Sequence, residues 1–102
     1  MKWIDAGLTN NLADGHAKSI AVGRRTIAVV RSGEAYYAIE DICTHDGAPL
    51  TGGEIEGNEI ICPRHGARFC LRTGEALTPP AYEPVRVFAT KIENGHLWVH
   101  AD

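Results

Sequence analysis

The sequence predicts an antiparallel all-β fold, and two observations carry that prediction. Short runs rich in β-branched and aromatic residues recur along the 102-residue chain, with turn-forming residues between them. The 11 Gly and 5 Pro are typical of a turn-rich β protein. Helical evidence is weak, because only residues 10–16 could form a turn of helix and Gly15 disfavours it. We therefore expect a small β-sandwich or barrel.

Seven β-like runs follow one another along the chain. They cover residues 17–22, 26–30, 36–39, 58–61, 67–71, 85–92 and 96–100. Turn signals separate several of them, at 31–34, 52–53, 72–75 and 94–95. The pair Asn94-Gly95 is the strongest hairpin signal, because both residues tolerate the positive φ of a type I′ turn. The last two runs are therefore expected to form a hairpin.

Length and charge exclude several classes of protein. The 102 residues fit one domain, and we expect residues 1–102 to form it. A net charge of −3 argues against nucleic acid as a partner, because phosphate binding needs clustered Lys and Arg. No run approaches the ~18 apolar residues that cross a bilayer, and the N-terminal residues lack the apolar stretch of a signal peptide. We expect a cytoplasmic protein with no membrane partner.

Two of the three cysteines begin nearly identical loops. Residues 43–50 read CTHDGAPL and residues 62–67 read CPRHGA, so each loop has a Cys, a His within three residues, and then Gly-Ala. Each follows a β-like run, and a hairpin-like excursion over residues 41–70 would bring both loops to one end of the domain. A third loop at 78–84 contains three of the five prolines, and it could form a stiff wall there.

The residue types in the two loops indicate a metal site. An odd number of Cys in a reducing compartment argues against a disulfide framework. The candidate ligands are two thiolates and two imidazoles, which suit zinc or iron–sulfur chemistry: Cys43, His45, Cys62 and His65. Zinc ligands usually come as Cys-x₂₋₄-Cys and His-x₃₋₅-His, whereas here each loop supplies one sulfur and one nitrogen. In an extended chain the Cα atoms of Cys43 and His45 would lie about 6–7 Å apart, which suits two neighbouring metals better than one.

The two loops together resemble the signature of Rieske-type [2Fe–2S] proteins, in which two His replace two Cys on one iron. The resemblance continues through HGARFCLRTGEALTPPA at 65–81, which is similar to the soluble Rieske ferredoxins of bacterial aromatic-ring-hydroxylating dioxygenase systems. It implies a Rieske-type β-sandwich or barrel with a small cluster-binding subdomain at one end, and one [2Fe–2S] cluster per chain. It also implies that Cys43 and Cys62 hold the inner iron, and that His45 and His65 hold the outer one.

The same resemblance implies a function. The chain would be a monomeric electron carrier and not an enzyme in its own right. It would accept single electrons from a flavin- or iron–sulfur-containing ferredoxin reductase and pass them to a terminal Rieske non-haem iron oxygenase. The chain would not be the oxygenase itself, because a mononuclear iron needs two more His and a carboxylate, and it has no room for a second domain. Two alternatives stay open: the small Rieske subunit of a nitrite reductase-like system, and a zinc-stabilised interaction module.

Three positions depart from the Rieske proteins of respiratory chains. Those proteins have an additional Cys in each loop, where this chain has Ala48 and Arg64, and they offer a hydroxyl where this chain has Ala67. With fewer hydrogen bonds to the cluster, its more negative reduced state is less stabilised. We therefore expect a potential near the lower limit of the family.

Other residues are given structural roles. The alternation of 67–71 predicts that Cys70 is a buried strand residue, and Trp3, Trp98 and Phe88 are expected in the core. The acidic stretch at 54–59 is expected to be a solvated face, with steering of a basic partner as the alternative.

Charge near the loop tips is a separate expectation. Arg64 lies in the second loop and Arg68 directly follows it, and Asp46 lies in the first loop. We expect charge at Arg64 and Asp46 to affect docking of a partner more than folding.

Overall fold

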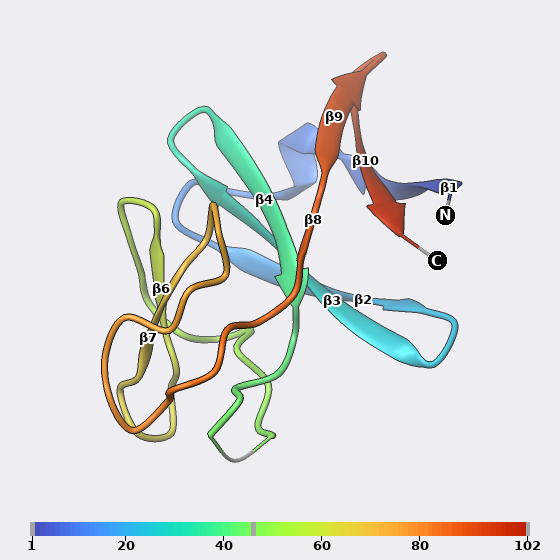
Figure 1. Ribbon diagram of the computed structural model, residues 1–102. Coiled ribbons are helices and arrows are strands. Elements are labelled where there is room, and N and C mark those ends of the chain that lie inside the picture. The colour runs from blue at the N-terminus through green and yellow to red at the C-terminus, as the bar shows by residue number, and fades with distance from the viewer. Residues whose placement is uncertain (1, 46, 102) are drawn as a thin grey trace.

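The computed structural model describes residues 2–45 and 47–101, and it confirms an antiparallel β architecture (Figure 1). The strands of the described residues form three small sheets. Among the described residues the helical structure is one short 3₁₀ helix at Thr9–Asn11, which overlaps only the start of the range 10–16 where the sequence allowed a helical turn. No helix in the described ranges is long and apolar enough to cross a membrane.

The middle sheet separates two hydrophobic cores. It has the order β2-β3-β4-β8, formed by β2 (Ala17–Val22), β3 (Arg25–Ser32), β4 (Ala35–Glu40) and β8 (Val87–Phe88). Residues 27–30 of β3 are buried on both faces, because successive side chains of a strand point to opposite sides. Ala28 and Val30 contribute to one core, and Ile27 and Val29 contribute to the other.

A second sheet covers one of these cores. It has the order β1-β10-β9, formed by β1 (Lys2–Leu8), β9 (Thr90–Glu93) and β10 (His96–Ala101). Asn94 and Gly95 have φ values of 55° and 75°, which confirms the predicted hairpin turn between β9 and β10. The predicted run 85–92 is divided at Ala89, because β8 pairs with β4 and β9 pairs with β10.

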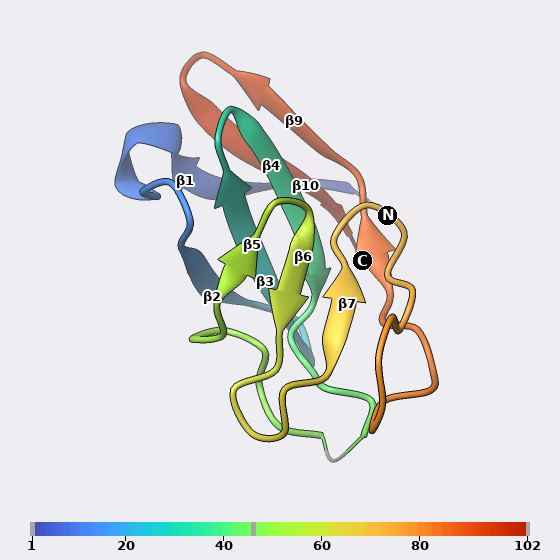
Figure 2. The same cartoon turned by 90° about the vertical axis from the view of Figure 1, so that its left-hand side faces the viewer.

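The third sheet covers the other core, which contains two of the cysteines. It is formed by β5 (Ile55–Glu56), β6 (Glu59–Ile61) and β7 (Arg68–Cys70). Cys43 and Cys62 are buried in this core with Leu50, Ile60 and Phe69. Figures 1 and 2 show the loops around the two cysteines at the end of the molecule away from the β9–β10 turn.

The aromatic residues divide between the core and the surface. Phe88 is buried, as predicted. The prediction was wrong for Trp3, which is 38% exposed and stacks on His100 with 4.8 Å between ring centroids. Trp98 is half-buried on the outer side of β10, where its neighbours Leu97 and Val99 point inward. The alternation of β10 therefore places its Trp on the solvent side of the sheet.

Candidate metal centre

The first loop is closed by two backbone hydrogen bonds that surround Cys43. The Cys43 N–H donates to the Ala48 carbonyl at 2.7 Å, and the Gly47 N–H donates to the Cys43 carbonyl at 2.7 Å. Gly47 has a φ of 79°, which an L side chain rarely adopts, so the glycine permits the tight return of the chain. The bond from the Gly47 N–H thus closes a turn on the Cys43 carbonyl.

The second loop repeats this backbone pairing position by position. The Cys62 N–H donates to the Ala67 carbonyl at 2.7 Å, and the Gly66 N–H donates to the Cys62 carbonyl at 3.0 Å. Gly66 has a φ of 76°. The duplication in the sequence is therefore also a duplication of backbone structure.

The two loops bring the four predicted ligands together with the cysteines inside and the histidines outside. Cys43 and Cys62 are each 1% exposed and belong to the same buried core. His45 and His65 are exposed, and their rings meet edge to face with centroids 5.1 Å apart and planes at 82°. One end of the molecule thus has a buried pair of sulfurs and a solvent-facing pair of imidazoles.

This donor set fits a [2Fe–2S] cluster with different ligands on its two irons. Two thiolates suit one iron, and two imidazoles suit the other. Within residues 2–45 and 47–101, no three Cys, His, Asp or Glu side chains converge as a single-ion site would require. In a [2Fe–2S] cluster of this kind, each iron takes two protein ligands.

Two features that sequence reasoning missed hold the loops in place. The carboxylate of Asp41 accepts hydrogen bonds from the backbone N–H of Leu50 and of Thr51, at 2.7 and 2.8 Å. Gly53 packs so closely on the strand leading to the second loop that a Cβ would overlap the Ile61 carbonyl oxygen. The Gly52-Gly53 pair was a sequence signal only for a turn, whereas Gly53 also provides this close approach.

The third cysteine begins a turn of the same kind. The Gly74 N–H donates to the Cys70 carbonyl at 2.7 Å, and the Cys70 N–H donates to the Glu75 carbonyl at 2.9 Å. Cys70 is half-buried, whereas the sequence predicted that it would be buried. A hydrogen bond from the Thr73 hydroxyl, with further backbone N–H donors, lowers the pKa of the Cys70 thiol.

The charged residues beside the second loop have specific partners. The guanidinium of Arg68 lies 2.8 Å from the Glu56 carboxylate and 3.3 Å from that of Glu59, and these two carboxylates raise the pKa of Arg68. Part of the acidic stretch is therefore an ion-paired face of the third sheet. Arg64 is exposed between Cys62 and His65. Asp46 lies outside the described residues.

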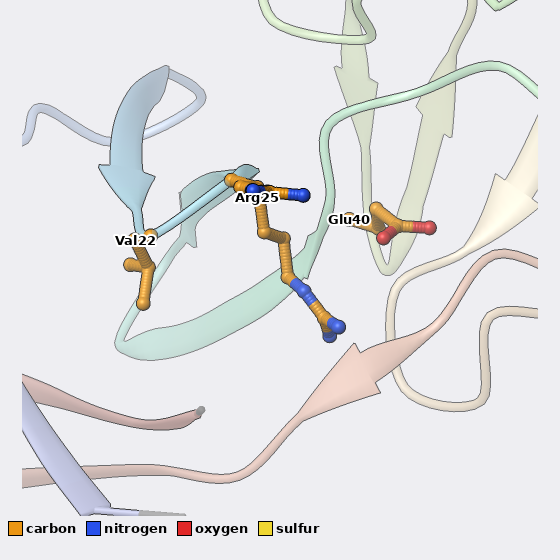
Figure 3. Close-up of a pocket in the computed structure, with 5 residues that line it drawn as sticks. Val22, Arg25 and Glu40 are labelled. Carbon is orange, nitrogen blue, oxygen red and sulfur yellow. The ribbon is translucent and has the colours of Figure 1, made fainter.

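A polar pocket lies apart from the two loops, at the turn between β2 and β3. It has a volume of about 490 Å³ and is lined by Val22, Gly23, Arg24, Arg25 and Glu40. Figure 3 shows Val22 and Arg25 on the side of the β2–β3 turn and Glu40 on the side of β4. None of the predicted ligands lines it.

Proteins of known family are similar to this chain in both sequence and fold. The model of the Rieske [2Fe-2S] domain family matches residues 2–89. The ferredoxin component of the naphthalene 1,2-dioxygenase/salicylate 5-hydroxylase systems of Ralstonia sp. is 36% identical over 92 residues, which are 90% of this chain and 88% of the relative.

Solved structures agree with this match. The carbazole 1,9a-dioxygenase ferredoxin from Nocardioides aromaticivorans IC177 is 29% identical, covers 100% of both chains and has a TM-score of 0.94. A chain in the complex of reduced oxygenase and oxidized ferredoxin of carbazole 1,9a-dioxygenase is 34% identical, with a TM-score of 0.90 over 95% of this chain and 91% of that one. With its paired Cys/His loops and this match over most of its length, the chain belongs to the Rieske [2Fe-2S] domain family.

Proposed function

We propose that this protein is a soluble, cytoplasmic electron carrier whose single [2Fe–2S] cluster is held by Cys43 and Cys62 on one iron and His45 and His65 on the other. The observation that supports this most strongly is the arrangement of the four side chains. Two turns with the same pattern of backbone hydrogen bonds have their sulfurs in the core and their imidazoles at the surface. The cluster, when bound, supplies a one-electron redox couple.

The cysteines and the histidines have different roles at the cluster site. The cysteines hold the buried side of the cluster, and the histidines bring its other side to the surface. Burial of the cysteines keeps water and exogenous thiols away from the inner side of the site. The exposed imidazoles shorten the path between the cluster and any protein that docks on this end. The similar proteins are ferredoxin components of dioxygenase systems, so we propose a carrier and not an enzyme.

The relatives support a proposal for the partners. The similar proteins are ferredoxin components of naphthalene dioxygenase systems and the ferredoxins of carbazole 1,9a-dioxygenase, one of them in complex with its oxygenase. We propose that this monomeric chain takes electrons from a flavin- or iron–sulfur-containing reductase and delivers them to a terminal Rieske non-haem iron oxygenase. Encounters of this kind are small and transient, which suits an exposed tip.

Stopped-flow mixing tests this function. The oxidised protein would be mixed with NADH and the reductase of the Ralstonia system, and the reduced protein with the matching oxygenase. Bleaching of the visible absorption in the first mix and its recovery in the second are expected. A cluster that dithionite reduces, but that neither partner reduces or oxidises, would contradict the proposal. A Cys43→Ala chain, which should lack the cluster, serves as the control.

A further inference from the structure

The third loop, residues 78–84, and the residues on either side of it form hydrogen bonds near each of the three cysteines. Their partners are Thr44 in the first ligand loop, Arg68 just after the second, and Gly74 in the turn of Cys70. Its entry is bonded to Arg68, which follows the second ligand loop. The Arg68 N–H donates to the Thr78 hydroxyl oxygen at 2.9 Å, and the Leu77 N–H donates to the Arg68 carbonyl at 2.8 Å. These bonds hold one end of the third loop beside the loop that contains His65.

The other end of the third loop is bonded to the turn of Cys70. The Val85 N–H donates to the Gly74 carbonyl at 2.8 Å. Gly74 has a φ of 81°, and a Cβ at this position would overlap the Val85 carbonyl oxygen. Only a glycine therefore lets the chain at residue 85 lie against this turn.

Between these ends, the first ligand loop provides a side-chain attachment. The Thr44 hydroxyl donates to the Glu83 carbonyl oxygen at 2.7 Å, across 39 positions of sequence. Thr44 lies between two proposed ligands, Cys43 and His45. Prolines at 79, 80 and 84 provide no N–H donors, so the third loop has few backbone bonds of its own. The hydrogen bond from the Thr44 hydroxyl partly compensates for these missing backbone hydrogen bonds.

The loop held in this way packs into the core that contains the buried cysteines. Ala81 is 3% exposed, and Val85, which directly follows the loop, is 4% exposed; both belong to the same core as Cys43 and Cys62. Tyr82, next to Ala81, is 81% exposed, so only one side of the loop is packed. A loop that lifts from the first turn would open a path for water to this core.

We propose that Thr44 is a positioning residue that latches the third loop over the cysteine side of the cluster site, and that the latch controls how readily water and chelators reach the cluster. This inference rests on the proposed cluster but not on any partner protein. Loss of one hydrogen bond of this kind should increase the population of the opened loop about fivefold. Local opening governs reactions that need access to a covered site.

The test compares Thr44→Val, Thr44→Ser and the wild type, each with its cluster bound. The first readout is the rate at which iron is lost to bathophenanthroline, and the second is the reduction potential. Thr44→Val should lose iron about fivefold faster than the wild type. Its potential should shift to more positive values, because water stabilises the additional negative charge of the reduced cluster better than a packed loop does. Thr44→Ser retains the hydroxyl and should behave as the wild type does.

Thr9→Val provides a matched control. The Thr9 hydroxyl also donates to a distant backbone carbonyl, that of Gly95 at 3.2 Å, in the part of the chain at the β9–β10 turn. This variant should change neither the iron-loss rate nor the potential. A Thr44→Val chain that loses its iron during purification while Thr44→Ser keeps it is the same result in extreme form.

Two outcomes would overturn the inference. One is a Thr44→Val protein whose iron-loss rate and potential match those of the wild type. The other is a Thr44→Ser protein as impaired as Thr44→Val, because the hydroxyl would then not be the cause. A wild-type protein without a cluster would instead contradict the proposed function, so the two failures are distinguishable.

Discussion

The carboxylate of Asp41 accepts a hydrogen bond from the Leu50 N–H at 2.7 Å, across the neck of the first ligand loop. The same oxygen accepts from the Thr51 N–H, and the second oxygen accepts from the Thr51 hydroxyl at 2.9 Å. Asp41 is 7% exposed, and Leu50 is fully buried. A buried carboxylate thus joins the two ends of the loop that contains Cys43 and His45.

Removal of this carboxylate should destabilise the loop and the protein. Asp41→Ala leaves the buried Leu50 N–H without its acceptor, which costs about 1–3 kcal/mol for that group alone. In a chain of this size, a loss of ~2 kcal/mol lowers the melting temperature by roughly 8–16 °C. Asp41→Asn keeps one acceptor oxygen and should show a smaller decrease. Calorimetry of the loaded proteins measures both, and an Asp41→Ala protein that melts with the wild type would contradict this role.

Cys70 should react as an activated thiol without being a cluster ligand. Its lowered pKa means that alkylation by iodoacetamide should reach half its maximal rate at a lower pH than for an unperturbed cysteine thiol. Thr73→Val removes the hydroxyl donor, so the midpoint should move to higher pH. Mass spectrometry of the loaded protein follows the reaction.

Cys70→Ser tests independently that Cys70 is not a cluster ligand. This variant should keep the visible spectrum of the wild type, because the proposed ligands are elsewhere. If the spectrum disappeared, Cys70 would have to be included in the ligand set. A wild-type alkylation midpoint at or above the ordinary value would refute the activated thiol.

Charge reversal at the tip should alter docking more than folding. Arg64 is exposed within the second ligand loop, so Arg64→Glu should change the rate of electron transfer to the oxygenase several-fold at low salt. The effect should diminish as salt screens the charges. Arg24→Glu, at an exposed position on the β2–β3 turn, is the matched control. Equal rates for both variants and the wild type at low salt would argue against docking on this tip.

The reduction potential should lie between those of plant-type ferredoxins and respiratory Rieske proteins. Two neutral imidazoles in place of two thiolates make the cluster less negative, so the potential should exceed about −400 mV. Without the additional cysteines and the hydroxyl, it should lie near −150 mV, roughly the lower limit for Rieske centres.

Ala67→Ser tests whether the missing hydroxyl contributes to the low reduction potential. Ala67 is fully buried beside Cys62, where its carbonyl accepts the Cys62 N–H. A serine hydroxyl there should raise the potential, because it can donate a hydrogen bond that stabilises the reduced state. Redox titration of both proteins measures the change. A potential that falls or stays constant would show that the hydroxyl has no such effect in this chain.

Much of this fold could be predicted from local sequence signals. The run 17–22 is a strand with the predicted bounds, and Asn94-Gly95 forms the predicted turn, because β-branched alternation and positive φ are local properties. Strand β1 was missed because Gly7 and Asp5 weaken its pattern, and pairing with β10 forms it nevertheless. The division of 85–92 at Ala89 depends on which strand each half meets, which is a tertiary property.

The candidate site was predictable in its ligands and not in its supports. The Cys and His residues are recognisable because the same pattern occurs twice. The bond between Thr44 and Glu83 joins positions 39 residues apart and leaves no periodic signal in the sequence. The exposure of Trp3 was missed for a related reason, since the side of the sheet that faces solvent depends on packing that a single aromatic residue does not indicate.

Metal and acid-labile sulfide analysis of the wild-type chain, purified without air, tests the proposed [2Fe–2S] site most directly. We predict about two iron and two sulfide per chain, with visible absorption, and loss of both in Cys43→Ala, His45→Ala, Cys62→Ala and His65→Ala. One zinc per chain, with no sulfide and no visible absorption, would contradict a [2Fe–2S] cluster at this site.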